Sequence, residues 1–306
     1  EKVLEANDFL PALNLVYNLR KNMNVRASYS RTLARPSFKE KSFVSILDPL
    51  SNIRFIGNID LKRTSINNVD ARWESFFGQG EMISVSGFYK HFTNPIEIAG
   101  FLLEPNDITP RNAGTAEVMG MEFETRKDFG FLSTSFKNLS IGTNITLVQS
   151  KIDMKEIVVA AGSDATFGTA DDVTEYASRL DNLRQGETLS QFRPMFGQSP
   201  YIINLNLSYN SDSLGLETRL SYNIQGKRLA VVGVGVRPDV YDQPFHSLNF
   251  KASKKFAQRW KASFTVQNIM NDRRESFFES YQAASQLFES YNPGRQFSLG
   301  VSFLID

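Results

Sequence analysis

The sequence predicts an all-β protein, a transmembrane antiparallel up-and-down β-barrel, and three observations lead to this expectation. Apolar and polar residues alternate with a period of two in many segments, as they do when successive side chains of a strand point to opposite faces. Most of these segments run to ten residues or more, which suits a strand that crosses a bilayer at a tilt. The connections between them alternate between short and long, so all the long loops fall at one end of the strands.

The alternation defines about eleven strands. It is clearest near the end of the chain, where Phe297, Leu299, Val301 and Phe303 alternate with small or polar residues. We expect strands at 11–20, 23–35, 64–77, 81–94, 116–127, 138–150, 199–210, 213–226, 244–254, 259–270 and 294–304. The polar face of each strand would line a lumen, and the apolar face would meet lipid.

This interpretation assigns a direction to individual side chains. The residues expected to point outward into lipid are Leu205, Leu216, Trp260, Phe264, Phe297, Leu299 and Val301. Those expected to point inward are Asn206, Arg219, Lys261, Thr265 and Ser298.

The connections follow one rule along the chain. The short ones are 21–22, 78–80, 210–212 and 256–258, and a somewhat longer one, 128–137, takes the same side. The long ones are 36–63, 95–115, 151–198, 227–243 and 271–293. Outer-membrane barrels have this asymmetry, with short periplasmic turns and long extracellular loops. A soluble β-rich binding protein is the alternative, since its strands also alternate.

Composition excludes several classes of site. The chain has no cysteine, which rules out disulfides and thiolate metal sites, and its only histidines are His91 and His246. The net charge of +1 gives no basic excess for nucleic acid. No serine, histidine and aspartate arrangement for catalysis is evident, so we expect a protein that is not an enzyme.

The start of the chain and the odd strand number suggest a part of a longer protein. Residues 1–5 have no apolar core region of a signal peptide. Bacterial outer-membrane barrels have even strand counts, whereas about eleven are expected here. We therefore expect residues 1–306 to be one part of a larger barrel.

A series of short motifs resembles the TonB-dependent receptors. One strand closes with Tyr29-Ser30-Arg31 and leaves through Arg35-Pro36, as in that family. The other motifs are Gly57-Asn58-Ile59-Asp60-Leu61-Lys62, Phe88-Tyr89-Lys90, Asn94-Pro95-Ile96, Asn112-Ala113-Gly114, Gly120-Met121-Glu122-Phe123-Glu124, Gln198-Ser199-Pro200-Tyr201, Val266-Gln267-Asn268-Ile269 and Pro293-Gly294-Arg295-Gln296-Phe297. They cover almost the whole chain in order, and they most resemble the motifs of receptors from Bacteroidetes-type bacteria. Ile59 replaces a common proline, and residues 304–306 follow the expected terminal aromatic, Phe303.

The resemblance implies a barrel of about twenty-two strands, of which this chain is the C-terminal half. It implies an N-terminal plug domain, a TonB box and a signal peptide that are not in this sequence. The implied function is TonB-dependent active uptake of a scarce ligand through the outer membrane of a Gram-negative bacterium. Siderophore, haem, peptide and oligosaccharide all remain open as ligands, and a passive porin-type channel is the alternative.

The same resemblance implies a set of partners. They are membrane lipid, the protein's own plug domain and the TonB–ExbB–ExbD complex, which would act through the missing N-terminus. A surface lipoprotein is a further candidate.

Two groups of charged residues share the expected lumen face. They are Arg72 with Glu74 on one strand, and Glu122 with Glu124 on another. A polar barrel wall, in which these charges face water, the plug or each other, is the interpretation we favour. Direct contact with a ligand is the alternative.

Two long loops carry the remaining candidate residues. Asp164, Asp171 and Asp172 lie near glycines in the loop 151–198, and such carboxylates suit a hard cation such as Ca²⁺, although the spacing does not match an EF-hand. The loop 271–293 carries Arg273, Phe277, Phe278 and Tyr281, and its central stretch is compatible with a short helix. These loop side chains would either grip a ligand or pack loop against loop, and we favour packing.

Overall fold

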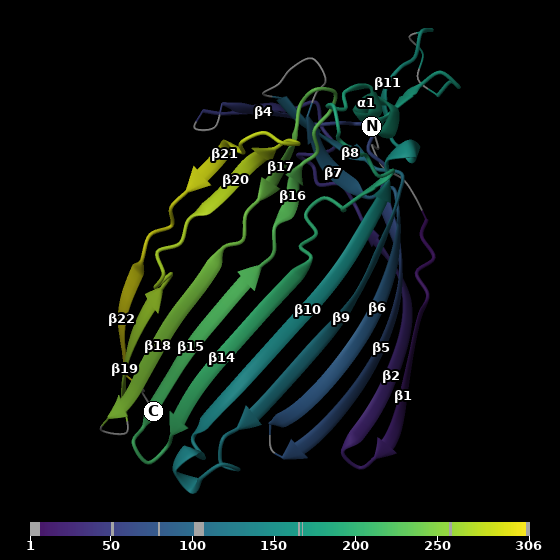
Figure 1. Cartoon of the computed structure of the whole chain (residues 1–306). Helices are drawn as coiled ribbons and strands as arrows, with labels where there is room; N and C mark the ends of the chain where they lie inside the picture. Colours follow the sequence, from purple (N-terminus) through teal and green to yellow (C-terminus); the bar gives the residue numbers. More distant parts are fainter. Residues whose placement is uncertain are drawn as a thin grey trace.

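The computed structural model describes residues 7–49, 52–78, 80–100, 107–164, 166, 168–256 and 259–303. In these residues eleven long strands form one antiparallel sheet, in the order β1-β2-β5-β6-β9-β10-β14-β15-β18-β19-β22. The strands are tilted and the sheet is curved, like a section of a barrel wall (Figure 1). Residues 79, 257–258 and 304–306, which belong to two short connections and to the end of the chain, lie outside the described residues.

The strand bounds follow the alternating segments closely. The sheet contains β1 (Ala12–Arg20), β2 (Met23–Ala34), β5 (Thr64–Gly78), β6 (Glu81–Thr93), β9 (Thr115–Asp128), β10 (Leu139–Asp153), β14 (Tyr201–Ser211), β15 (Leu216–Gln225), β18 (His246–Phe256), β19 (Trp260–Gln267) and β22 (Gln296–Phe303). A two-residue strand, β13 (Phe192–Arg193), adds to the end of β10. The predicted all-β fold and its eleven principal strands are confirmed.

The register of the sheet separates an apolar face from a polar face. On one face Leu205 pairs with Tyr222, and on the other Asn206 pairs with Ser221. Following the pairing from β14 to β22 keeps all seven residues that we expected to face lipid on the first face, and all five expected inward residues on the second. Orientation toward lipid itself stays a prediction.

Large apolar side chains remain exposed on the first face. Leu205 is 37% exposed, Phe264 38% and Leu299 85%. Fully buried apolar residues gather instead among the long loops, in one cluster around Leu229 and Val232 and another around Ile152 and Ile157. Among the described residues neither buried cluster covers the apolar face of the sheet. This arrangement suits a wall that meets lipid, because lipid takes the place of a packed core.

The long connections fold into structure of their own at one end of the sheet (Figure 1). They contain the strands β3 (Ser45–Asp48), β4 (Ile53–Ile56), β7 (Ile96–Gly100), β8 (Asp107–Asn112), β11 (Val158–Ala160), β12 (Val173–Thr174), β16 (Arg228–Val231), β17 (Asp239–Asp242), β20 (Arg274–Glu279) and β21 (Gln286–Tyr291), and the helix α1 (Glu175–Asp181). Two 3-10 turns, Thr134–Phe136 and Met154–Glu156, complete the elements. In the described part of the chain no helix is long and apolar enough to cross a membrane.

A hinge turns the β7–β8 hairpin away from the strands that lead into it. Asn94 and Gly114 have φ angles of 55° and 46°, in the left-handed region that asparagine and glycine tolerate best. The N–H of Asn94 donates to the carbonyl of Gly114, so the two bends lie opposite each other. Asn112 stabilises this corner, because its side-chain amide donates to the carbonyls of Lys62 and Asn94.

The hinged hairpin connects two small sheets to each other through an isolated bridge. The sheet β3-β4-β8-β7 and the sheet β16-β17-β20-β21 meet through a parallel bridge between Ala99 and Val232, with the N–H of Gly100 3.0 Å from the carbonyl oxygen of Val232. β16 continues β15, whereas β7 continues β6, and β9, β10 and β14 separate β6 from β15 in the large sheet. The hairpin therefore spans a gap three strands wide. We call the eight strands together the upper sheet.

One sequence prediction in this region is wrong. The central part of the loop 271–293 forms β20 and β21 rather than a short helix. β20 is held between β17 and β21, with Tyr241 opposite Phe277 and Arg274 opposite Tyr291. Aromatic residues favour positions in a strand that is paired with neighbouring strands. The pairing with β17 and β21 therefore makes this segment a strand and not a helix.

Candidate functional site

On the polar face, charged residues of β2, β5 and β9 form a chain of ion pairs. Glu74 binds Arg26 at 2.6 Å and Arg72 at 3.1 Å. Arg72 also reaches Glu124 at 3.0 Å, and Glu124 binds Arg126 at 2.8 Å. Charges directed at each other across strands are what the polar-wall interpretation expects.

Glu122 lies on the same face but outside this chain of ion pairs. Its carboxylate accepts a hydrogen bond from the side-chain amide of Asn144 on β10. The structure therefore brings Arg72, Glu74 and Glu124 into direct contact and places Glu122 beside them. A role in ligand contact stays a prediction for all four.

Two candidate residues of the loop 271–293, Phe278 and Tyr281, contact residues of other loops, and Phe278 also contacts a ring of its own loop. The rings of Phe278 and Phe288 meet edge to face at 5.1 Å, and the guanidinium of Arg237 lies 5.7 Å from the centre of the Phe278 ring. The hydroxyl of Tyr281 donates to the carbonyl of Gly186 at 2.9 Å. Whether Phe278 and Tyr281 also contact a ligand stays a prediction.

The other two candidates of that loop have different surroundings. Phe277 lies opposite Tyr241 of β17, on the neighbouring strand of the upper sheet. Arg273 is exposed, and its backbone N–H donates to Asp272 Oδ1. Whether either side chain touches a ligand stays a prediction.

The three aspartates proposed for calcium bind groups of their own loop. Asp171 accepts hydrogen bonds from the hydroxyls of Thr169 and Ser163, each at 2.8 Å, and these bonds lower its pKa to about 2. Asp164 accepts from the N–H of Thr166, and Asp172 from the N–H of Gly168. Within the described residues, no group of three or more histidine, aspartate or glutamate side chains is placed to hold a metal ion. The calcium site stays a prediction.

A groove lies at the long-loop end of the polar face. Its polar part is a cavity of about 370 Å³ whose wall includes Asn223 and Gln225 of β15. Asn223 pairs with Asn204 and Ser247, so the groove is on the polar face of the large sheet. The rest of the wall is formed by Gly226, Arg228, Asp242, Gln243, Phe245, Arg274, Glu275, Ser276, Glu289 and Tyr291.

The apolar part of the groove adjoins the polar part. It is a cavity of about 340 Å³ that shares Asp242, Ser276 and Glu289 with its neighbour. Its apolar lining comes from both halves of the upper sheet: Ile46, Ile53, Phe55, Ile98, Ile108, Ala230, Val231 and Phe288. Register explains how distant segments meet, since Ile46 pairs with Phe55 and Phe55 with Ile108. The hairpin that spans the gap thus supplies one wall of the groove.

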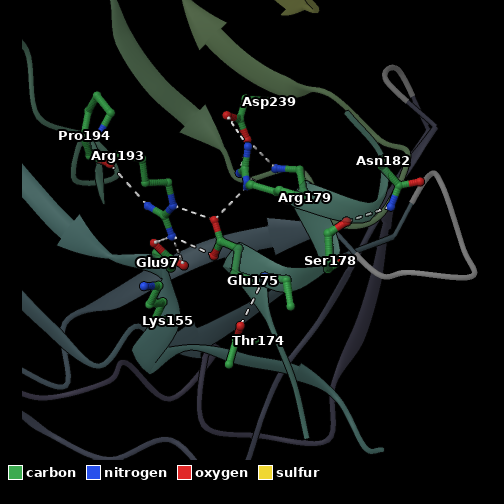
Figure 2. A network of polar contacts seen from close by, with 12 residues as sticks. Glu97, Lys155, Thr174, Glu175, Ser178, Arg179, Asn182, Arg193, Pro194 and Asp239 are labelled. Carbon is green, nitrogen blue, oxygen red and sulfur yellow. Dashed lines mark hydrogen bonds and ion pairs between the residues drawn. The ribbon is translucent and has the colours of Figure 1, made fainter. Parts of the chain in front are cut away.

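Glu97, the neighbour of the groove-lining Ile98, belongs to a buried network of ion pairs (Figure 2). Arg193 contacts Glu97 at 2.7 Å and Glu175 at 2.7 Å, and the three side chains are 6%, 1% and 1% exposed. Glu175 also contacts Arg111 and Arg179. Arg179 in turn binds Asp239 through both terminal nitrogens, at 3.0 and 2.7 Å.

The network holds three arginines and three carboxylates, so its charges balance. Buried charges are tolerated only when they are paired and hydrogen-bonded. Burial alone would raise the pKa of Glu175, but the three arginines, Arg193 foremost, lower it to about 2. Burial would likewise lower the pKa of Arg193, and Glu97 and Glu175 raise it instead. Glu175 and Arg193 are therefore both charged at neutral pH.

The network connects three of the long loops. Glu97 and Arg111 come from the β7–β8 hairpin, Glu175, Arg179 and Arg193 from the loop 151–198, and Asp239 from the loop 227–243. Helix α1, which carries two of these residues, begins where the hydroxyl of Thr174 accepts a hydrogen bond from the N–H of Ala177. On β7, Glu97 enters the network while its neighbour Ile98 lines the groove, as alternation along a strand requires.

Sequence reasoning missed both the groove and the network. Residues of the network that contact each other directly are up to 96 positions apart in the chain, so no local spacing reveals them. One signal was present. Glu97 stands alone between Ile96 and Ile98 in an apolar strand, and a charge in that setting needs a partner.

Comparison with known proteins gives the family. The family model of the TonB dependent receptor-like β-barrel matches residues 2–269. A search of curated protein sequences gives no match.

Solved structures share the fold. The structure of a variant of the ferric enterobactin receptor from Pseudomonas aeruginosa, in complex with enterobactin, is similar with a TM-score of 0.58 and 14% identity, over 97% of this chain and 40% of that one. The siderophore receptor PirA from Acinetobacter baumannii gives a TM-score of 0.55 and 12% identity, over 97% and 41%. The ferric citrate transporter FecA in its unliganded form gives 0.55 and 14%, over 96% and 38%.

This chain thus spans about two fifths of the length of these structures. The family match covers well over half of the chain, and the antiparallel sheet with its two faces agrees with it. The chain belongs to the TonB-dependent receptor-like β-barrel family.

Proposed function

We propose that this chain forms the C-terminal part of the barrel of a receptor that carries out TonB-dependent active uptake across the outer membrane of a Gram-negative bacterium. The observation that carries the proposal is the groove, which lies on the polar face at the long-loop end and has a wall made of distant loops. A ligand arriving from outside meets that end first. Residues outside this chain would supply the plug and the segment that TonB contacts.

The ion-paired chain on β2, β5 and β9 fits the same proposal. Arg72, Glu74 and Glu124 lie on the face that would surround a plug domain. A wall that already satisfies its own charges can face a removable domain without leaving buried charges unpaired when that domain shifts. We propose these residues as part of the plug-facing wall.

The test is depletion of compounds from a defined medium by three strains. One strain carries the complete receptor, the second lacks it, and the third carries it but has no functional TonB. We expect at least one compound that only the first strain depletes, as measured by mass spectrometry of the medium. Depletion that persists without TonB would indicate the passive porin-type channel instead.

A further inference from the structure

In the described part of the groove, the carboxylate of Glu289 and the guanidinium of Arg274 form no ion pair. Arg228 is neutralised by Asp242, with Nε 2.9 Å from Oδ2, and Ser276 donates to the other oxygen of the same carboxylate. Within the described residues, the carboxylate of Glu289 makes no hydrogen bond or ion pair. The guanidinium of Arg274 lies over the ring of Phe245, 4.6 Å from its centre, and meets no carboxylate in the same described part.

These two charges are close neighbours on one face of the upper sheet. Arg274 pairs with Tyr291 and Ser276 pairs with Glu289, so Arg274 and Glu289 are diagonal neighbours on adjacent strands. Diagonal positions of this kind are separated by roughly 7–8 Å between their Cα atoms. The guanidinium of Arg274 and the carboxylate of Glu289 thus lie near each other, next to the apolar part of the groove.

The overall charge of the groove disfavours a polyanion. Its described lining has three cations, Lys39, Arg228 and Arg274, and four carboxylates, those of Asp48, Asp242, Glu275 and Glu289. Lys39 lies over the ring of Phe55, and Arg228 is already paired. A strongly anionic ligand would meet more like charge than opposite charge here.

Building on the function proposed above, we propose that the groove binds short zwitterionic peptides with apolar side chains. The ligand's carboxylate would bind Arg274 and its ammonium group would bind Glu289. Its side chains would lie against Ile98, Ile108 and Phe288 in the apolar part. Cavities of about 370 and 340 Å³ are in the size range of small-ligand sites.

The test is calorimetric titration of the complete receptor in detergent with the tripeptide Leu-Phe-Leu, its N-acetylated form and its C-terminal amide. Arg274→Gln and Glu289→Gln should each weaken binding of the free tripeptide about tenfold, as expected for loss of one hydrogen bond to a charged group. The acetylated peptide should be insensitive to Glu289→Gln, and the amide insensitive to Arg274→Gln. Glu187→Gln, in a loop outside the groove, is the control and should leave binding unchanged.

Two results would overturn the proposal. One is binding of the N-acetylated peptide and of the C-terminal amide that is as tight as binding of the free tripeptide. The other is tighter binding of ferric enterobactin than of the tripeptide, which would mark a site for polyanions. Because calorimetry does not require TonB, failure here leaves the uptake proposal to the depletion experiment. Conversely, depletion that does not depend on TonB would contradict the uptake proposal but not the proposal of a peptide site.

Discussion

Arg193 and Glu175 lie 18 positions apart in the chain and meet as a buried ion pair, with Nε of the arginine 2.7 Å from Oε1 of the glutamate. Helix α1 presents the glutamate and β13, at the end of the large sheet, presents the arginine. The second carboxylate that Arg193 binds, Glu97, comes from the β7–β8 hairpin. One guanidinium thus fixes a loop helix and the hairpin that walls the groove.

Replacing Glu175 with glutamine should undock these loops. The substitution leaves Arg193 and Arg111 buried with one carboxylate fewer, and breaking a buried pair in this way costs about 3–5 kcal/mol. We expect faster amide hydrogen exchange in residues 95–100, 107–112 and 173–193 of the complete receptor, with β14 and β15 unaffected. Glu187→Gln is the matched surface control, and equal protection in both variants would contradict the role assigned to the network.

Low pH should undock the same loops, because it protonates Glu175. The folded pKa of Glu175, about 2, lies below its ordinary value of 4.5. A carboxyl group whose pKa is lower in the folded state than in the unfolded state stabilises the folded protein at pH values above the unfolded pKa. This stabilisation is lost as the pH falls through the folded-state pKa. Exchange rates in the loops, corrected for intrinsic chemistry, should be constant from pH 7 to about pH 5 and rise between about pH 4.5 and pH 2. In Glu175→Gln this rise should be absent or much smaller.

The large sheet was predictable from the sequence, because its determinants are local. The alternation of apolar and polar residues around Leu205 and around Phe297 arises because the side chains of a single strand point in turn to an apolar face and to a polar face. Predicted and observed ends of the strands differ by a few residues at most, as between 138–150 and Leu139–Asp153. Placement of Arg72, Glu74 and Glu124 on one polar face followed from the same alternation.

The long-loop end was not predictable, because its determinants are distant in sequence. The hinge at Asn94 depends on Gly114 opposite it. No local pattern predicts that Ala99 of β7 will bridge Val232, the residue after β16. The stretch around Phe277 was compatible with a helix until its neighbour on β17 was known. The groove needs all of these pairings at once, so single-segment patterns could not show it.

The two outer edges of the large sheet predict how residues 1–306 behave when expressed alone. In the described part of the chain β1 and β22 end the sheet and do not pair with each other. Open strand edges invite aggregation in water and are not tolerated in lipid. We expect no heat-resistant monomer from residues 1–306 in detergent, in contrast to the complete receptor run on the same gel. A monodisperse, heat-resistant species from the 306 residues would show that this sheet closes without further strands.

Charge on the apolar face should be costly, and on the adjacent polar face tolerated. Leu205 pairs with Thr143 and Tyr222, whereas Asn206 pairs with Gly142 and Ser221 on the opposite face. Leu205→Arg should cost about 2–4 kcal/mol if the side chain lies near the bilayer midplane, because lipid cannot solvate the guanidinium. Asn206→Arg should cost much less, since that face is wet. Urea titrations of the complete receptor in lipid vesicles would measure both.

Enlarging the same residue separates lipid from a packed protein core. Leu205→Arg would damage a soluble β-sandwich as well, because the apolar face of a sandwich is buried too. A close-packed core also resists extra volume, typically by about 1–3 kcal/mol, whereas fluid lipid accommodates it. Leu205→Phe should therefore leave the free energy of unfolding within about 0.5 kcal/mol of the parent value, the range of a surface substitution. Phe264→Leu is the matched control for loss of volume on the same face, and strong destabilisation by Leu205→Phe alone would mean that this strand packs against protein.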